Sequence, residues 1–282
     1  MAKRIDLNKK IDTNKSKDYV LGTGKDELHR LGLQHQIWAA EARKGWEIAE
    51  FGKGQTILDL GCGPGFASRD LSYIVGEEGK VIAVDKSKNF INFLDQIKAL
   101  HGLNIDTHCA DFDDMVLNPM SLDGVFCRWA LLWVANPAEI VQKISDAMRP
   151  GAAFVAHEYF DWSTHQTYPR YEGLAKAIEI AFKSMQEGDG DMNIGRELPG
   201  IFYDAGLEVI STRPMAKLGG PDDLAWQWPK SFYEIYFPKL VQAGLLTKDQ
   251  LNTALDEMDE LEMHEGALIF GPMMLEVVAI KV

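Results

Sequence analysis

The sequence is poor in cysteine, in positive charge and in long apolar runs. Its 282 residues include three cysteines, Cys62, Cys109 and Cys127, and no two of them have the spacing of a metal-ligand pair. A small, odd number of cysteines argues against a disulfide framework and favours a reducing compartment. The longest apolar stretches, such as residues 129–135, are far too short to cross a bilayer. Residues 1–20 also lack the apolar segment of a secretory signal. We therefore expect a cytoplasmic protein without a membrane partner.

Basic residues are outnumbered, since 29 Lys and Arg face 42 Asp and Glu, for a formal net charge of −13. This balance does not suit a protein that binds a phosphate backbone. Residues 1–17 carry six Lys or Arg, but Asp and Asn are interleaved with them. That pattern predicts a solvated leader and disfavours a nucleic-acid-binding arm. We expect no nucleic-acid partner.

Short β-type runs alternate with helical patterns through the middle of the chain. The runs lie at residues 56–60, 81–85, 105–110, 124–128 and 152–159. Strands that alternate with helices of 10–15 residues are typical of parallel βαβ units with helices on both faces of the sheet. The fold class predicted is therefore α/β, with a doubly wound, Rossmann-like sheet.

The helix signals are local. Ser87 is placed to cap a helix, and the pair Asn136-Pro137 opens another that Gly151 is expected to close. After a helix at residues 199–205, two further strands are expected at 207–215 and 274–282.

The chain is expected to divide into a core and several additions to it. We place the parts at residues 1–50 (leader and helical cap), 51–160 (cofactor-binding core), 161–198 (helical insertion), 199–218 (core), 219–266 (helical lid insertion) and 267–282 (last core strand). Both insertions follow strand carboxyl ends, where an open parallel sheet binds its ligand. They are candidates for a lid and for the walls of a substrate pocket.

The most informative motif is Ile57-Leu58-Asp59-Leu60-Gly61-Cys62-Gly63-Pro64-Gly65. Glycines here allow a tight turn after the first strand and a close approach of the backbone to a ligand. A nicotinamide dinucleotide fingerprint would instead read G-x-G-x-x-G, but Phe66 stands where its third glycine would be. Asp59 would also repel a pyrophosphate. A dehydrogenase is therefore disfavoured, and a ligand with an amino or sulfonium cation is favoured.

Two further acids follow the next two strands. Asp85 lies 20 residues after Gly65, at a position suited to hydrogen bonds with ribose hydroxyls. Asp111 follows the third strand and could accept a hydrogen bond from an adenine amino group, with Phe112 beside the ring. Three successive strand ends thus describe a pocket for an adenosine without phosphates. Each acid also has a plainer interpretation as a structural carboxylate, and for Asp59 the two interpretations have equal weight.

These residues resemble the class I S-adenosylmethionine-dependent methyltransferases, in particular the small-molecule branch with loops of the ILDLGCGPG type. The resemblance covers residues 56–159 well and implies a seven-stranded, mostly parallel sheet with an antiparallel last strand. It implies S-adenosylmethionine as the cofactor and no metal ion. In that family the residues after the fourth strand, here Arg128 and Trp129, face the methionine moiety. Many relatives carry Asn or Ser where this chain has Arg128, so the role of that side chain stays open.

The resemblance extends to residues 19–38, which look like the leader of a subset of these enzymes, in which a helix closes over the cofactor. Together these matches imply a cofactor-binding set that consists of Tyr19, Gln34, Asp59, Gly61, Gly63, Gly65, Asp85, Lys86, Asp111, Phe112 and Arg128.

The predicted reaction is in-line transfer of the activated methyl group to N, O or C of a small-molecule acceptor. A general base is optional for such a transfer. His157, Glu158 and His165 are candidates, but each has an ordinary interpretation: a satisfied core histidine, an acid that caps or forms an ion pair, and a solvated loop histidine. No catalytic residue is therefore assigned. Alternative functions are methylation of RNA or DNA on the same fold, or cofactor binding without catalysis. A homodimer is compatible with the sequence, which says nothing about oligomeric state.

Overall fold

A computed structural model describes residues 21–282 of the chain; Tyr19, one of the expected cofactor residues, lies outside them. The helices are α1 (Lys25–Ile48), α2 (Phe66–Val75), α3 (Lys88–His101), α4 (Pro137–Ala147), α5 (Glu172–Gln186), α6 (Leu198–Asp204), α7 (Leu224–Gln242) and α8 (Lys248–Glu262), with short 3₁₀ turns at η1 (Leu131–Trp133), η2 (Trp162–Thr164) and η3 (Ile194–Arg196).

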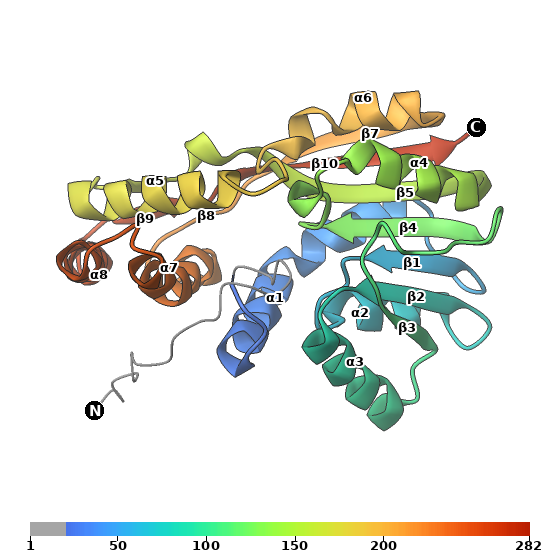
Figure 1. Ribbon diagram of the computed structural model, residues 1–282, viewed down its shortest axis with the longest axis horizontal. Coiled ribbons are helices and arrows are strands. Elements are labelled where there is room, and N and C mark those ends of the chain that lie inside the picture. The colour runs from blue at the N-terminus through green and yellow to red at the C-terminus, as the bar shows by residue number, and fades with distance from the viewer. Residues whose placement is uncertain (1–20) are drawn as a thin grey trace.

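The main sheet has seven strands in the order β3-β2-β1-β4-β5-β10-β7 (Figure 1). They are β1 (Thr56–Leu60), β2 (Lys80–Asp85), β3 (Ile105–Cys109), β4 (Leu122–Arg128), β5 (Met148–Asp161), β7 (Leu207–Met215) and β10 (Met273–Lys281). Pairing is parallel from β3 to β5, and β10 runs antiparallel to both of its neighbours. The prediction of a mostly parallel seven-stranded sheet with an antiparallel last strand is confirmed.

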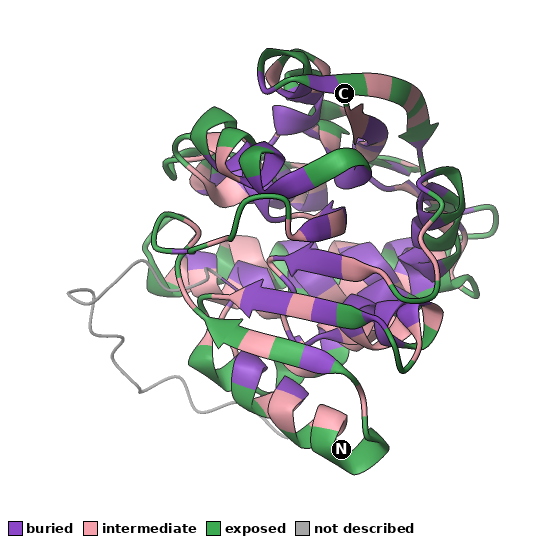
Figure 2. Ribbon diagram, turned by 90° about the vertical axis from the view of Figure 1, so that its right-hand side faces the viewer, coloured by how far each residue is buried: buried purple, intermediate pink, exposed green. Residues whose placement is uncertain are grey.

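Helices cover both faces of this sheet. One buried core joins α4 and α6 to it through side chains such as Ile144 and Phe202. The other joins α1, α2 and α3 to the opposite face through side chains such as Trp46, Leu71 and Leu94. The central strands are buried along most of their length, whereas the edge strand β3 is largely exposed (Figure 2).

Helices α5, α7 and α8 lie together beyond one end of the sheet (Figure 1). They accompany a second, three-stranded antiparallel sheet, in the order β6 (Gln166–Tyr168), β9 (Leu268–Phe270) and β8 (Leu218–Gly219). The sequence did not indicate this sheet, because two or three residues are too few to show a strand alternation.

One predicted helix boundary is wrong. Gly151 was expected to close the helix that begins at Pro137, but α4 ends at Ala147 and β5 begins at Met148. Met148 already pairs with Leu122 of β4, and the register then shifts before Gly124 pairs with Ala153. Gly151 has a φ of +83°. Its left-handed conformation therefore serves an irregularity in a strand, not a helix end.

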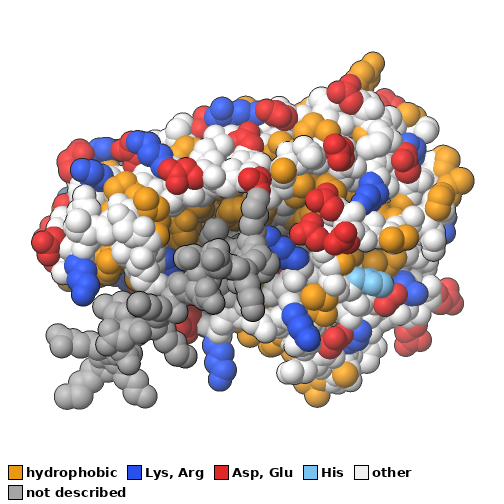
Figure 3. Space-filling view, in the orientation of Figure 1, with side chains coloured by type: hydrophobic (Ala, Val, Ile, Leu, Met, Phe, Trp, Pro, Cys, Tyr) orange, Lys and Arg blue, Asp and Glu red, His pale blue; other side chains and the backbone are white. Residues whose placement is uncertain are grey.

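None of the helices within residues 21–282 combines the length and the apolar character needed to cross a bilayer. On the face shown in Figure 3, the Lys and Arg side chains of the described residues are scattered among Asp and Glu and form no continuous basic patch.

Candidate active site

The sheet topology brings the carboxyl ends of four strands to one edge. Leu60 at the end of β1 pairs with Val84 on one side and with Cys127 on the other, and Asp85 pairs with Cys109 of β3. The carboxyl ends of β1, β2, β3 and β4 are therefore aligned. The chain runs outward from β1 to β3 and then returns to the other side of β1 as β4. This reversal is the place where doubly wound sheets bind ligands.

The glycine loop turns sharply off β1. Gly61, Gly63 and Gly65 all have positive φ, at +68°, +54° and +82°. A Cβ atom on Gly61 would overlap that of Ala130, just beyond β4, whereas a Cβ on Gly63 would meet no atom within 4 Å. Gly61 is therefore required by packing against the residues after β4. Gly63 is the glycine that faces open space, where a ligand could approach the backbone.

Asp85 lies directly against this loop. Its Oδ2 accepts a hydrogen bond from the Gly63 backbone N–H at 2.9 Å, and its Oδ1 accepts one from the Ser87 N–H at 2.7 Å. Burial raises the pKa of the carboxyl group. Each oxygen keeps a second lone pair for a ligand hydroxyl. Asp85 therefore organises the glycine loop and remains in position to contact a ribose.

Asp59 points into the protein. Its side chain is 2% exposed and accepts a hydrogen bond from the Ser68 hydroxyl of α2. Burial raises its pKa to about 6, although the Ser68 bond and the nearby Arg128 charge work against that increase. No backbone N–H of the glycine loop is bonded to it among the described residues. Asp59 therefore joins β1 to α2 through Ser68, and within residues 21–282 the loop's own N–H groups are not its partners.

The remaining acid, its aromatic neighbour and the predicted lysine lie further out. Asp111 is exposed, and its Oδ1 accepts a weak hydrogen bond from the Asp113 N–H at 3.3 Å. The Phe112 ring lies close to Gly61, within 3.4 Å of where a Cβ would stand. Lys86 is exposed beside Asp85. Phe112 therefore lies near the glycine loop, while Asp111 and Lys86 are exposed at the ends of the neighbouring strands.

Arg128 ends β4 beneath helix α1. Its Nη2 donates to Nδ1 of His35 at 3.1 Å, and its Nη1 is buried without a hydrogen-bond partner among the described residues. Because Arg only donates, Nδ1 of His35 must accept, and Nε2–H then donates to Asp70 at 3.1 Å. Burial lowers the pKa of Arg128 to about 10, still well above neutrality. The result is a charged group near the carboxylates of Asp59 and Asp70, with one buried N–H donor that has no hydrogen-bond partner among the described residues.

Gln34 of α1 is buried and joins two segments that are distant in sequence. Its Oε1 accepts from Arg30 Nη1 at 2.7 Å and from Trp228 Nε1 of α7 at 3.0 Å. Arg30 also forms a buried ion pair with Glu27, at 2.7 Å. Gln34 thus lies at the wall between α1 and α7, and its oxygen is already engaged.

An apolar cavity of about 60 Å³ adjoins this wall. It is lined mainly by aromatic and methionine side chains, with three polar residues: Leu21, Arg30, Gln34, Trp129, Leu132, Trp133, Tyr159, Trp162, His165, Met185, Met192, Trp228, Pro229, Phe232 and Pro272. The lining comes from α1, from the residues after β4 and β5, and from α5 and α7. The segments expected to form a substrate pocket do converge on one space.

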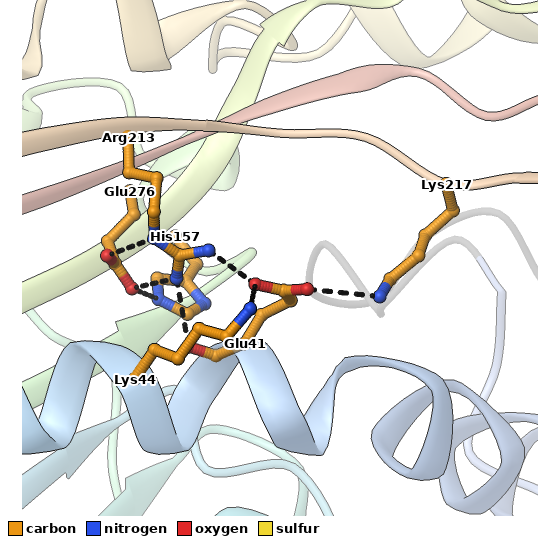
Figure 4. A network of polar contacts seen from close by, with 6 residues as sticks. All are labelled: Glu41, Lys44, His157, Arg213, Lys217 and Glu276. Carbon is orange, nitrogen blue, oxygen red and sulfur yellow. Dashed lines mark hydrogen bonds and ion pairs between the residues drawn. The ribbon is translucent and has the colours of Figure 1, made fainter.

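Two of the three candidate bases belong to the protein interior. His157 bonds Glu276 of β10 at 2.8 Å, within the network that Figure 4 shows with Arg213 and Glu41. Glu158 is fully buried and accepts from the backbone N–H groups of Ala130 and Leu131, both at 2.9 Å. The interpretation of Glu158 as a capping acid is confirmed. His157 is a core histidine, but it is not fully satisfied, because its Nδ1 has no hydrogen-bond partner among the described residues.

The expectation for His165 is wrong, because it is 9% exposed and lines the cavity. Its Nδ1–H donates to the Phe270 carbonyl at 2.7 Å, so its Nε2 accepts from the Tyr233 hydroxyl at 2.6 Å. Burial lowers its pKa to about 4, so the ring is neutral near pH 7. The polar sequence around it gave no sign that β9 and α7 would enclose it.

Sequence reasoning missed His35 and Asp70, which hold Arg128, as well as Arg30 and Tyr233. Each lies in an ordinary helical pattern, and its role depends on contacts between distant segments. Among residues 21–282, no three His, Cys, Asp or Glu side chains are grouped as metal ligands.

Comparison with known proteins agrees with this geometry. Residues 51–202, more than half of the chain, match the family model of the methyltransferase domain. The chain belongs to the methyltransferase-domain family. The predictions of this family, and of S-adenosylmethionine as the cofactor that its members use, are confirmed.

Individual relatives are distant. The chain is 29% identical to the demethylmenaquinone methyltransferase of Lactococcus lactis over 54% of this chain and 57% of that enzyme. It is 27% identical to the enzyme of the same name from Oceanobacillus iheyensis, over 64% and 79%. The chain spans about half the length of the first curated relatives that it matches.

Among solved structures, the geranyl diphosphate C-methyltransferase of Streptomyces coelicolor, in complex with S-adenosyl-L-homocysteine, is similar with a TM-score of 0.55. It is 14% identical, and the match covers 93% of this chain and 89% of that one. At this identity the likeness shows the fold alone.

Proposed function

We propose that this protein transfers the methyl group of S-adenosylmethionine to a small-molecule acceptor bound in the aromatic cavity. One observation carries the proposal: a single turn, Arg128–Leu131, contributes to both places. Arg128 stands with the glycine loop at the carboxyl edge of the sheet, and its neighbour Trp129 lines the cavity. A donor and an acceptor bound at these two places would meet across this turn.

The residues present fit the cofactor. The buried Nη1 of Arg128, which has no partner among the described residues, would bind the carboxylate of the methionine part. The open space at Gly63 would admit the adjoining chain, and Asp85 would accept hydrogen bonds from the ribose hydroxyls. Phe112 and Asp111 would contact the adenine. Lys86 would lie at the rim beside Asp85, and Gln34 would face the site from the wall between α1 and α7. Tyr19, which lies outside the described residues, completes the proposed set.

The bound cofactor would supply a methyl group already activated by its sulfonium, so the protein needs mainly to align the acceptor and exclude water. The cavity provides a rigid aromatic wall for that purpose. Trp129 packs against Trp228 and Tyr159 with ring centroids 5.9 and 5.8 Å apart. His165 offers a neutral polar group in this wall, with its tautomer fixed by Phe270.

The lining favours an acceptor whose buried part is largely apolar. Arg30, the one cationic side chain in the lining, is neutralised by Glu27. Relatives named demethylmenaquinone methyltransferase are named for a largely apolar quinone, which is consistent with this lining. The chain is acidic overall, and the described residues on the face shown in Figure 3 form no continuous basic patch for RNA or DNA.

The test uses two probes that differ in the methionine part. Wild-type protein should bind S-adenosylhomocysteine more tightly than 5′-methylthioadenosine, which lacks the carboxylate. Arg128→Met should weaken the first by about tenfold or more and the second by less than about twofold, because only the first loses a charge-assisted hydrogen bond. Calorimetry with both ligands measures this. Equal losses for the two ligands would remove Arg128 from the carboxylate site.

Methyl transfer itself is tested with S-adenosylmethionine labelled in its methyl group and an extract separated into metabolites, RNA and protein. Label is expected in the apolar metabolite fraction. Label in RNA or protein alone would overturn the proposed acceptor class.

A further inference from the structure

Trp129, which directly follows β4 and lines the aromatic cavity, adopts an unusual backbone conformation. Its φ is +54°, in the left-handed region that bulky residues rarely adopt. Such conformations persist only where the surroundings hold them, and they are concentrated at functional sites. The structure should therefore contain a group that holds this one in place.

The carboxyl group of Glu158 is that group. Its Oε1 accepts hydrogen bonds from the backbone N–H groups of the two residues that follow Trp129, Ala130 and Leu131, each at 2.9 Å. The thiol of Cys127, two residues before Trp129, lies 3.7 Å from the same oxygen. Trp129 itself donates its N–H to the carbonyl of His157 at 3.1 Å. One carboxyl oxygen of Glu158 is thus bonded to residues on both sides of Trp129.

The turn is placed where a small change would affect both ligands. On one side Ala130 is in contact with Gly61 of the glycine loop. On the other, the Trp129 indole is packed against Trp38 of α1 and Trp228 of α7, with ring centroids 5.7 and 5.9 Å apart. The Arg128 guanidinium lies 5.3 Å from the centre of the same indole.

Glu158 is also not part of an ion pair. It is 0% exposed, and its second oxygen, Oε2, has no hydrogen-bond partner among the described residues. Within residues 21–282, the only titratable side chain bonded to it is Cys127, while Tyr159 is adjacent on its own strand. Glu276, on the neighbouring strand β10, bonds His157 and Arg213 instead. An ion pair among the described residues therefore does not account for the burial of the Glu158 carboxyl group.

We infer that Glu158 is a positioning residue for the methyl transfer, which holds the Trp129 turn in its strained form and so sets both the cofactor crevice and the acceptor cavity. This inference rests on the proposed function for its purpose, but the contact between Glu158 and the turn stands without it. Glu158 touches neither ligand in this account and acts through Trp129 and Ala130.

Burial raises the pKa of Glu158 to about 8, so the group is mainly protonated at neutral pH. Glu158→Gln then keeps the shape, the accepting oxygen and the absence of charge. Glu158→Leu keeps the approximate volume and removes the acceptor. Glu276→Gln, another carboxyl group that is 0% exposed, serves as the matched control on the adjoining strand.

The readout is the ¹⁹F spectrum of full-length protein labelled with 5-fluorotryptophan, in which Trp129→Phe identifies the Trp129 resonance. Glu158→Leu should move or broaden that resonance and weaken S-adenosylhomocysteine binding by about tenfold, because two backbone donors lose their acceptor. Glu158→Gln should leave both nearly as in the wild type. Glu276→Gln should lower the thermal midpoint without moving the Trp129 resonance.

A pH titration gives a second readout that does not depend on the Leu variant folding. Between pH 7 and 9 the Trp129 resonance of the wild type should shift with a midpoint near 8, and that of Glu158→Gln should not. An unmoved Trp129 resonance in a folded Glu158→Leu, or the same titration in Glu158→Gln, would overturn the inference. Failure of the wild type to bind S-adenosylhomocysteine would instead count against the proposed function, since the spectra still test the turn.

Discussion

At the scale of single residues, the glycine loop depends on the carboxylate of Asp85, for which the sequence left both a ribose contact and a structural role open. It accepts from Gly63 on one oxygen and from Ser87 on the other. Because Asp85 holds the glycine loop in shape and would also contact the cofactor, its loss should reduce the affinity for the cofactor in two ways.

Asp85→Ala should therefore weaken S-adenosylhomocysteine binding by about 1.5–3 kcal/mol, the range for a lost charge-assisted hydrogen bond. Asp106→Ala, on the exposed edge strand, is the matched control and should leave the affinity unchanged. Calorimetry on both variants measures the difference. Wild-type affinity in a folded Asp85→Ala would show that Asp85 serves the loop alone.

At the scale of elements, the cap helix α1 and the helix α7 are joined by one buried amide. Gln34 accepts hydrogen bonds from Arg30 and from Trp228, which lies 194 residues away in the sequence. Since both helices contribute to the cavity, this bond ties its two sides together.

Gln34→Leu should lower the free energy of unfolding by about 1–3 kcal/mol, because two buried donors lose their acceptor. The increase in local unfolding should be confined to the contact between α1 and α7. Hydrogen exchange in residues 224–242 should accelerate more than exchange in β1 and β4. Uniform acceleration across the chain would contradict a local joint.

Some of these elements could be predicted from the sequence, and others could not. The strands β1 to β5 and the order of the site acids follow from local patterns, because apolar runs, glycines and caps act over a few residues. The Ser87 cap, for example, receives the Phe90 N–H as expected. His165 could not be predicted in the same way, since its burial depends on Tyr233 and Phe270, which lie more than 60 residues away. The short strands β6, β8 and β9 are likewise defined by their partners.

At the scale of the whole molecule, a charged network fastens α1 to the far strands of the sheet (Figure 4). Arg213 of β7 bonds Glu276 of β10 and Glu41 of α1, and His157 of β5 completes it. Burial alone would raise the pKa of Glu41, but the hydrogen bond from Arg213 and the charge of Lys217 outweigh it and lower that pKa to about 2.

Arg213→Met should lower the free energy of unfolding at pH 7 by about 2–4 kcal/mol, somewhat below the range for a fully buried pair because 26% of the Arg213 side chain is exposed. A carboxylate whose pKa is lowered by folding contributes stability above its unfolded pKa and loses it as the pH falls. The penalty should therefore shrink as the pH falls from 4.5 toward 2, the interval between the two pKa values of Glu41. Urea unfolding of both proteins over this range tests it, and a penalty independent of pH would argue against an ionic origin.

In the function proposed above, the carboxyl edge of β1, β2 and β4 binds an adenosine that carries an amino-acid tail and no phosphates. Isothermal titration of the full-length protein with S-adenosylhomocysteine, and in parallel with NAD⁺, measures this most directly. We predict one site per chain for S-adenosylhomocysteine and no heat of binding for NAD⁺. Binding of NAD⁺ with no response to S-adenosylhomocysteine would contradict the account.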